Sequence, residues 1–350
     1  MIKQHKRGFL LLGTLFLLPL VPHIHAADVD PLFLSSQTLN ISLSGPFTTI
    51  DRKRDKEEQY TGGSLTYLDQ GQQVTLDVKF KVRGNYRLRK DVCSHAQLWL
   101  DFDKEQVAGT LFENQNKLKL VVQCRNRLHY RNTLLKEHQV YQLYNTISDL
   151  SFRTRLVNIL YEDTDRDRSR SEFGIIIEHK DRLADRTGMN NVSLNKIDYR
   201  SLDPLQGTIA GLFMYLTGNT DFSFISAHED ECCHNAILLH PVGEKRYFPV
   251  PYDFDSTGYV DASYAEVNPG LPLRSVRQRL YRGFCVPQGI MNEALAPFRA
   301  NQEQILSIAS DSRYLDENSA RKSVEYLQAF FDIINDPEKR QDEIIKKCRG

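Results

Sequence analysis

Hydrophobic and polar residues alternate through much of the first half of the chain, which indicates β-strands. The apolar residues of segment 74–82 occupy every second position, as in a strand with one buried face. Arg83-Gly84-Asn85 ends this strand with a turn. Further strands are predicted at 98–102, 118–122, 156–161 and 173–178, the last two forming a hairpin around 163–168. The first half is therefore expected to be a mostly antiparallel sheet.

Apolar residues at helical spacing predict one helix beside this sheet and several more in the second half. The first helix spans 133–147, with Thr133 as its cap and Glu137 near the edge of its buried stripe. Asp203-Pro204 begins the next helix and Thr217-Gly218 ends it. A strand pair at 236–240 and 247–250 and closing helices at 292–310 and 319–334 follow. These elements predict an α+β fold.

The pattern divides the chain into four parts. Residues 1–26 have a basic start, an apolar run over 9–21 and a small residue at the end, which is typical of a signal peptide. We therefore expect an exported protein, periplasmic or secreted, with no membrane span once this segment is removed; an uncleaved anchor is the alternative. Residues 27–60 are assigned to an N-terminal extension, 61–180 to a β-rich lobe with one helix, and 181–350 to a helical lobe that contains the strand pair.

The composition is that of a folded globular protein, with 41% hydrophobic and 26% charged residues. The 45 basic and 45 acidic residues balance, and the chain without residues 1–26 is slightly acidic. This balance disfavours nucleic acid as a partner and gives no general attraction to anionic polymers. No oligomeric state is predicted.

Six cysteines form an even set, which favours disulfides in an exported chain. Cys93 and Cys124 flank two predicted strands and could be joined by a disulfide, although the sequence alone does not fix the connectivity. Cys232 or Cys233 is the candidate partner of Cys285. Because the geometry of a disulfide opposes bonding between neighbours, Cys232 and Cys233 are not expected to bond to each other.

Asp253 and Asp255 are the most prominent chemical feature, because they follow an apolar strand two residues apart. In an extended segment both carboxylates point to one side, and such close like charges repel unless a cation lies between them. Hard divalent cations prefer these oxygen ligands. The alternative is a pair of aspartates that only cap a turn.

Asp221 and Asn235 extend this acidic feature. Asp221 follows the predicted helix, and His234-Asn235 begins the strand pair. Asp221 could accept the proton of a substrate hydroxyl, while Asn235 could bind the same metal as Asp253. A base, a metal-binding amide and a metal-binding carboxylate, in this order, are the parts of a phosphoryl-transfer site. The alternative is an ordinary helix end and turn around Asp221.

Four motifs together resemble the spore-coat-protein-H-like (CotH) family of atypical protein kinases. They are Arg83-Gly84-Asn85, Gly218-Asn219-Thr220-Asp221, His234-Asn235 and Asp253-Phe254-Asp255, and they lie in the family's order. The segment 175–178, which ends in Glu178, also resembles the family's hinge. The resemblance implies a two-lobed protein-kinase-like fold, with an antiparallel β-rich N-terminal lobe and a mainly helical C-terminal lobe. It further implies ATP or another nucleotide, Mg or Mn, and a hydroxyl acceptor on a protein or an envelope component.

The resemblance also implies a role for each matching residue. Asp221 would be the catalytic base, and Asp253 would hold the metal. The remaining candidates are the metal-binding Asn235 and Asp255 and the nucleotide-binding Arg83, Lys117, Lys119, Glu137 and Glu178. In this interpretation Glu137 pairs with Lys117 or Lys119, which reaches the phosphates, and Glu178 borders the base.

The chain departs from the family pattern at three points. The gap between Asp221 and Asn235 is long, Phe222 stands where the family often has Arg, and segment 100–102 lacks an expected Lys. An exported chain would also meet little ATP. Two rival functions therefore stay open: a catalytically inactive, kinase-like binding or assembly protein of the cell envelope, and a metal-dependent phosphoesterase.

Three weaker signals point elsewhere. Asp163, Asp165 and Asp167 begin like a calcium loop, but the required Gly and Glu are missing, so a solvated hairpin tip is expected. The cluster of His and Cys at 228–234 has poor spacing for zinc, which leaves disulfides as the better use of its thiols. A basic stretch at 83–90 and 125–131 could bind phosphates or protect a sheet edge.

Overall fold

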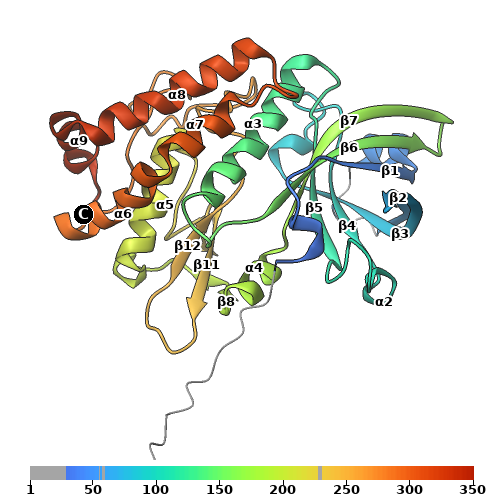
Figure 1. The fold of residues 1–350 in the computed structure, drawn as a ribbon, viewed down its shortest axis with the longest axis horizontal. Coiled ribbons are helices and arrows are strands. Elements are labelled where there is room, and N and C mark those ends of the chain that lie inside the picture. The colour runs from blue at the N-terminus through green and yellow to red at the C-terminus, as the bar shows by residue number, and fades with distance from the viewer. Residues whose placement is uncertain (1–28, 55, 57–59, 228–230) are drawn as a thin grey trace, which may run out of the picture.

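Seven strands of the first half form one continuous wall. The computed structural model describes residues 29–54, 56, 60–227 and 231–350, so the expected signal peptide lies outside the described residues. Around the wall, the strands follow the order β1 (Leu39–Gly45), β2 (Thr61–Asp69), β3 (Gln72–Arg83), β4 (Gln97–Asp101), β5 (Lys117–Val122), β7 (Arg168–Ile177) and β6 (Thr154–Asp163). They form the right-hand part of the molecule in Figure 1.

This wall is a closed barrel, which corrects the predicted fold. β1 pairs in antiparallel orientation with β2 and in parallel orientation with β6, so the first strand joins the last and the sheet has no open side. The expected two-lobed, kinase-like arrangement is therefore wrong, although the chain is α+β overall. β1 comes from the segment assigned to an N-terminal extension, and a parallel pairing over such a sequence distance leaves no local pattern.

Side chains along the strands point alternately into the barrel, where they form its core, and out to its outer face. Leu76, Val78 and Phe80 of β3 are buried in the barrel core. The polar residues between them point outward, because successive side chains of a strand point to opposite faces. The register aligns Lys81 of β3 with Trp99 of β4, and Trp99 with Lys119 of β5. A row of basic and aromatic side chains thus crosses the outer face.

Two neighbouring glycines of β2 should respond oppositely to replacement by alanine. A methyl group at Gly63 would overlap the carbonyl oxygen of Ser44 and the ring of Phe80, whereas one at Gly62 meets nothing within 4 Å. We expect Gly63→Ala to lower the free energy of unfolding by about 1–3 kcal/mol through overpacking. Gly62→Ala should leave it unchanged or raise it by about 0.5 kcal/mol. Urea denaturation of both variants checks this; equal effects would contradict the packing of the barrel wall.

Most of the described α-helices lie in the second half. They are α4 (Lys180–Arg186), α5 (Pro204–Thr217), α6 (Gln288–Ala300), α7 (Gln302–Ser310), α8 (Glu317–Asn335) and α9 (Pro337–Glu343). The first half adds α1 (Phe47–Lys53), α2 (Lys104–Val107) and the long α3 (Leu128–Asn145). The short strands are β8 (Met189–Val192), β9 (Leu194–Asn195), β10 (Glu231–Cys232), β11 (Ala236–Pro241) and β12 (Phe248–Pro251).

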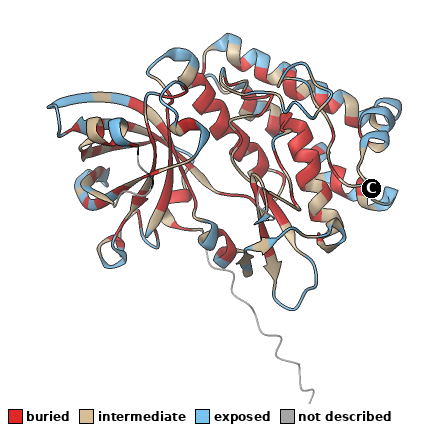
Figure 2. Cartoon of the chain, turned by 180° about the vertical axis from the view of Figure 1, so that it is seen from behind, coloured by how far each residue is buried: buried red, intermediate tan, exposed pale blue. Residues whose placement is uncertain are grey.

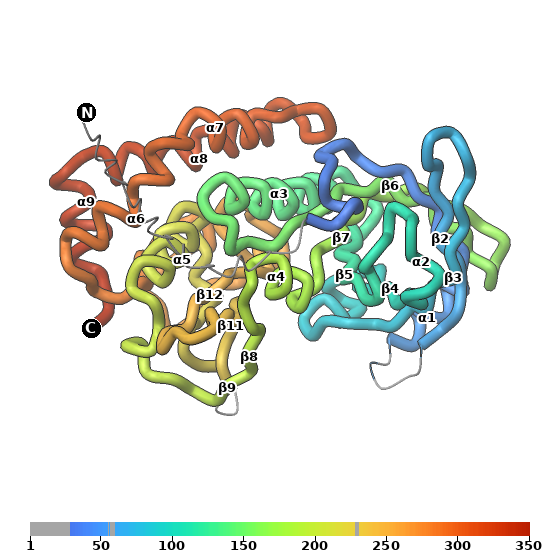
Figure 3. The backbone as a smooth tube through the Cα atoms, turned by 60° about the horizontal axis from the view of Figure 1, so that its bottom comes forward, coloured from blue at the N-terminus to red at the C-terminus, as the bar shows by residue number. Residues whose placement is uncertain are grey.

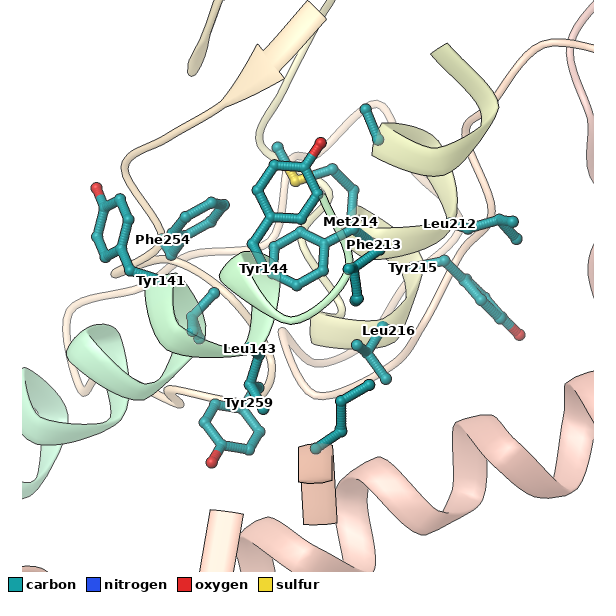
Figure 4. Close-up of a cluster of buried hydrophobic side chains, with 14 of the residues drawn as sticks. Tyr141, Leu143, Tyr144, Leu212, Phe213, Met214, Tyr215, Leu216, Phe254 and Tyr259 are labelled. Atoms are coloured by element: carbon teal, nitrogen blue, oxygen red, sulfur yellow. The ribbon is translucent and has the colours of Figure 1, made fainter. Parts of the chain in front are cut away.

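Helix α3 connects the barrel to the helical part. It packs on β6 and β7 on one side and on α7 on the other, as Figure 3 shows. Its side chains Tyr141 and Tyr144 point toward Phe254 and Phe213, with ring centroids 4.8 and 4.3 Å apart (Figure 4). These rings belong to one large core that holds α3, α5 and the segment after β12 in fixed positions.

The predicted helix boundaries hold in part. Asp203 caps α5, because its side chain accepts a hydrogen bond from the backbone N–H of Gln206. Gly218 ends the helix with a φ of 65°. α3 begins five residues before Thr133, which lies inside the helix. The single closing helix expected at 292–310 is divided at Asn301 into α6 and α7, while α8 matches the last predicted helix.

Three disulfides connect the six cysteines, which is compatible with an exported protein. The predicted bond between Cys93 and Cys124 is confirmed. The other two predictions are wrong, because Cys232 bonds to its neighbour Cys233, and Cys285 bonds to Cys348 near the C-terminal end.

Burial is concentrated on the barrel strands and the inner helices, and the tip of the β6–β7 hairpin is exposed (Figure 2). Across the part of the chain that is described, none of the helices combines the length and the apolar character needed to cross a bilayer.

The stability of the barrel should depend on the protonation of His95, which lies between two acids. Its Nδ1 is 2.9 Å from Asp51 and its Nε2 is 3.4 Å from Glu172, with Arg170 also nearby. Burial opposes protonation, but the two carboxylates prevail and raise the pKa of His95. A raised pKa stabilises the fold at low pH, and this contribution is lost as pH rises above about 6.5. We expect His95→Gln to flatten this part of the profile of unfolding free energy against pH; an unchanged profile would contradict the assignment.

Candidate functional site

Two adjoining cavities lie between the barrel and the helical part. The smaller measures about 360 Å³ and the larger about 700 Å³, and Arg83 and Tyr252 line both. The smaller cavity is walled by apolar and aromatic side chains and by basic groups, namely Trp99, Tyr141, Phe152, Ile177, Ile237, Lys117, Lys119 and Lys180, together with Glu178 and His179. Such a concave space with a few convergent polar groups is the usual setting of a ligand site.

The larger cavity brings together the four oxygen-bearing side chains singled out in the sequence. Asp221, Asn235, Asp253 and Asp255 all line it. Asp221 lies just after the end of α5, and its Oδ1 is 2.9 Å from Nε2 of His234. The hydrogen bond to Asp221 raises the pKa of His234, although burial opposes it.

The backbone at Asn235 and Asp253 is held in an unusual conformation. Their φ angles are 52° and 63°, in the left-handed region that residues other than glycine rarely adopt. Asn235 donates hydrogen bonds from Nδ2 to the backbone oxygen of Asp221 at 2.7 Å and to its Oδ2 at 3.2 Å. Asn and Asp tolerate this region better than other residues, and here it fixes the direction of the two side chains that line the cavity.

Arg87 lies at the centre of the acidic cluster. It comes from the 3₁₀ turn Tyr86–Leu88 after β3, and its guanidinium lies 3.4 Å from Glu137, 3.5 Å from Asp253 and 3.1 Å from Asp255. Glu137 thus pairs with Arg87 and not with the predicted Lys117 or Lys119. Burial raises the pKa of Glu137, and Arg87 only partly opposes this effect. The guanidinium is the cation that allows the carboxylates of Asp253 and Asp255 to lie so close together.

Lys119 points from β5 into the smaller cavity. Its Nζ lies 4.0 Å from Oδ1 of Asp253 and 5.0 Å from the ring centroid of Tyr252. Burial lowers the pKa of Lys119, and Asp253 partly restores it. Burial disfavours the charge of Asp253, but Lys119 and Arg87 outweigh it and lower the pKa of that carboxyl group.

Arg83 is a cation that has no carboxylate partner among the described residues. Within the described ranges, its guanidinium makes no ion pair within 4.0 Å, and its recorded contact is the Trp99 ring at 5.5 Å. Burial lowers its pKa, and the charge of Asp253 partly opposes this. A largely buried guanidinium that faces two cavities is available for an anion.

Glu178 lines the smaller cavity, but its carboxylate is already occupied. Arg186 binds it through two hydrogen bonds of 2.8 and 3.0 Å, and the backbone N–H of Arg153 donates a third at 2.9 Å. The side chain therefore fixes the segment after β7, where Ile177 and His179 form the cavity wall.

Two of the predicted metal ligands, Asp253 and Asn235, present oxygen atoms to the larger cavity. In the described part of the chain, no three His, Cys, Asp or Glu side chains gather as a metal site. Among the described residues, Oδ1 of Asp253 is buried and accepts no hydrogen bond, although Arg87 and Lys119 lie 3.5 and 4.0 Å from it, and no hydrogen bond to Oδ1 of Asn235 is formed. Asp255 instead pairs with Arg87 at 3.1 Å. Two oxygen ligands suit a magnesium ion that a phosphate also binds.

The weaker metal candidates do not form sites. Asp163 and Asp165 accept hydrogen bonds from Thr48 and Thr49, which ties the β6–β7 turn to α1. Cys232 and Cys233 are bonded to each other, and His228 lies outside the described residues.

No protein-family model matches the sequence, and no curated protein has significant similarity to it. The assignment of the cavities therefore depends on their geometry. Sequence reasoning missed Arg87 as the centre of the cluster and Trp99 and Tyr252 as cavity walls. A signal for Arg87 was available, because it lies two positions after Arg83-Gly84-Asn85, in the basic stretch.

Proposed function

We propose that this protein transfers a phosphoryl group from a nucleotide to a hydroxyl group. One observation carries the proposal: Arg83 and Lys119 stand where an apolar cavity meets an acidic one, and Lys119 faces Asp253 at 4.0 Å. A ligand with a flat apolar part and a polyanionic tail matches this arrangement. A nucleoside triphosphate is such a ligand, with its base beside Trp99 and Ile177 and its phosphates toward Arg83 and Lys119.

Each side chain then has a defined task. Arg83 and Lys119 bind phosphate oxygens, and Arg87 holds Asp253 and Asp255 in place. Asp221 accepts the hydrogen bond of the acceptor hydroxyl, with His234 fixing its carboxylate. Positioning and charge stabilisation of this kind account for most of the catalysis in phosphoryl transfer.

A divalent metal fits two of the three expected ligands. Asp253 and Asn235 would hold Mg or Mn together with the phosphates, and Asp255 would act only through Arg87. When bound, such an ion neutralises charge on the phosphate oxygens.

A second candidate is a nucleotide-binding protein without turnover. The observation that favours it is the ion pair of Arg87 with Asp255, because it removes one carboxylate from metal binding. The phosphoesterase is not favoured by any contact in the cavities.

The test of the proposal is nucleotide binding in the presence of Mg. We expect ATP with Mg at a hundred times its Kd to stabilise the intact chain by about 2.7 kcal/mol. Lys119→Gln should weaken ATP binding at least tenfold, because it removes the cation beside the phosphates. Lys79→Gln, an exposed lysine on β3, is the matched control and should bind normally. Calorimetry and thermal unfolding measure both; no stabilisation by any nucleotide would refute the proposal, and binding without transfer to any acceptor would favour the second candidate.

A further inference from the structure

A third hollow lies on the outer face of the barrel, beside the larger cavity. It measures about 370 Å³. Its lining residues are Lys56, Tyr60, Lys81, Val82, Arg83, Gly84, Asn85, Trp99 and Lys117. Arg83, Gly84 and Asn85 also line the larger cavity, so the two spaces adjoin. A ligand whose hydroxyl reaches Asp221 can therefore extend across Gly84 into this hollow.

The register of the strands creates a cluster of cations here. Lys81 lies opposite Trp99, and Lys117 stands on the next strand, opposite Asp101. Arg83 follows Lys81 by two positions, on the same outward face. Arg83 and Lys117 lie 5.5 and 4.7 Å from the Trp99 ring, and Lys81 occupies the strand position paired with Trp99.

Within the described residues, these cations have aromatic neighbours but no carboxylate partners. Lys81 lies 5.5 Å from the Tyr60 ring, and Lys117 lies 4.7 Å from the Trp99 ring. Over the residues that are described, neither lysine forms an ion pair within 4.0 Å, and no acidic side chain lines the hollow. Like charges this close repel one another, so binding of an anion with several charges is favoured.

The barrel wall argues against a peptide as the ligand. The strands beneath the hollow are paired on both sides, so an extended peptide cannot add to a sheet edge. The groups that face the hollow are amines, the Asn85 amide and the Tyr60 and Trp99 rings, which suit hydroxyl and anionic groups on a compact ring.

We propose that this hollow binds the phosphate or sulfate groups of an anionic saccharide. The same saccharide is the acceptor of the phosphoryl group, which rests on the proposed function. Lys81 is the diagnostic residue, because it lines the hollow but neither of the two cavities.

The experiment uses Trp99 as the reporter, since it is the only tryptophan of the chain. The intact protein, saturated with ADP and Mg, is titrated with sucrose octasulfate, and tryptophan fluorescence is followed. Sucrose and a hexaglutamate peptide are titrated in parallel. Lys81→Gln is compared with Lys79→Gln, which removes a lysine from the same strand and face outside the hollow.

We expect saturable binding of sucrose octasulfate, at least tenfold weaker in Lys81→Gln and within twofold of normal in Lys79→Gln. Sucrose and hexaglutamate should not bind. Equal binding by both variants, tighter binding of hexaglutamate, or competition with ADP would each overturn the proposal. If binding depends on Lys81 but no phosphate is transferred from ATP, the proposed function is refuted. The proposed ligand class of the hollow is supported in that case.

Discussion

Asp253→Asn is expected to lower the rate of phosphoryl transfer at least about a hundredfold, the scale of losing one electrostatic contact to a transition state. Oδ1 of Asp253 is buried without a hydrogen-bond partner, and the side chain faces Lys119 at the junction of the cavities. The amide keeps the shape and removes the charge. Nucleotide binding should weaken far less than turnover, because Arg83 and Lys119 remain. Transfer of labelled phosphate from ATP under single-turnover conditions measures the effect.

Asp261→Asn is the matched control for this variant. Asp261 has a φ of 55°, close to the 63° of Asp253, but it pairs with Arg277 and lines neither cavity. Its replacement should leave transfer within twofold of normal. A fully active Asp253→Asn protein would remove Asp253 from the chemistry.

Arg87→Met is expected to produce the largest loss of stability, about 3–5 kcal/mol, because it leaves buried carboxylates without their counter-charge. The Arg87 side chain is 9% exposed, and it lies between Glu137, Asp253 and Asp255. Methionine preserves much of the apolar stem, so the loss reports the charge. Urea denaturation at pH 7.5 gives the unfolding free energy.

The exposed Arg89 provides the control, since it is two residues away and pairs only with Asp91 at the surface. Arg89→Met should change stability by less than about 0.5 kcal/mol.

The dependence of the unfolding free energy on pH is an independent test of the role of Arg87. Burial raises the pKa of Glu137 from 4.5 to about 7, so the folded state binds a proton more tightly than the unfolded state, and stability increases as pH falls through that range. Without Arg87 this increase should be steeper; equal profiles for the two proteins would contradict the assignment.

Local elements were predictable where the signal was local. Asp203 and Gly218 defined both ends of α5 because a capping carboxylate and a left-handed glycine act within a few residues. Thr133 misled the prediction of α3, because the helix begins at Leu128 without a side-chain cap that a sequence pattern could indicate.

The site was predictable as a set of residue types but not as a network. By sequence Arg87 is one of several arginines in a basic stretch, and its burial depends on α3 and the segment after β12, which bring carboxylates to it. The basic hollow could not be predicted from the overall charge, because its lysines and arginine come together only in the folded sheet. Balanced totals say nothing about Lys81, Arg83 and Lys117, which strand alternation places on one face.

The parallel pairing of β1 with β6 has a consequence for how the chain is made. Asn40 and Asn158 are neighbours in that pairing, although 118 residues separate them. In a chain that emerges from the ribosome or a translocation pore, one edge of β1 therefore has no hydrogen-bond partner until β6 has emerged. Because such distant contacts form late and slowly, this interval is when the nascent protein is most exposed to aggregation and most dependent on chaperones.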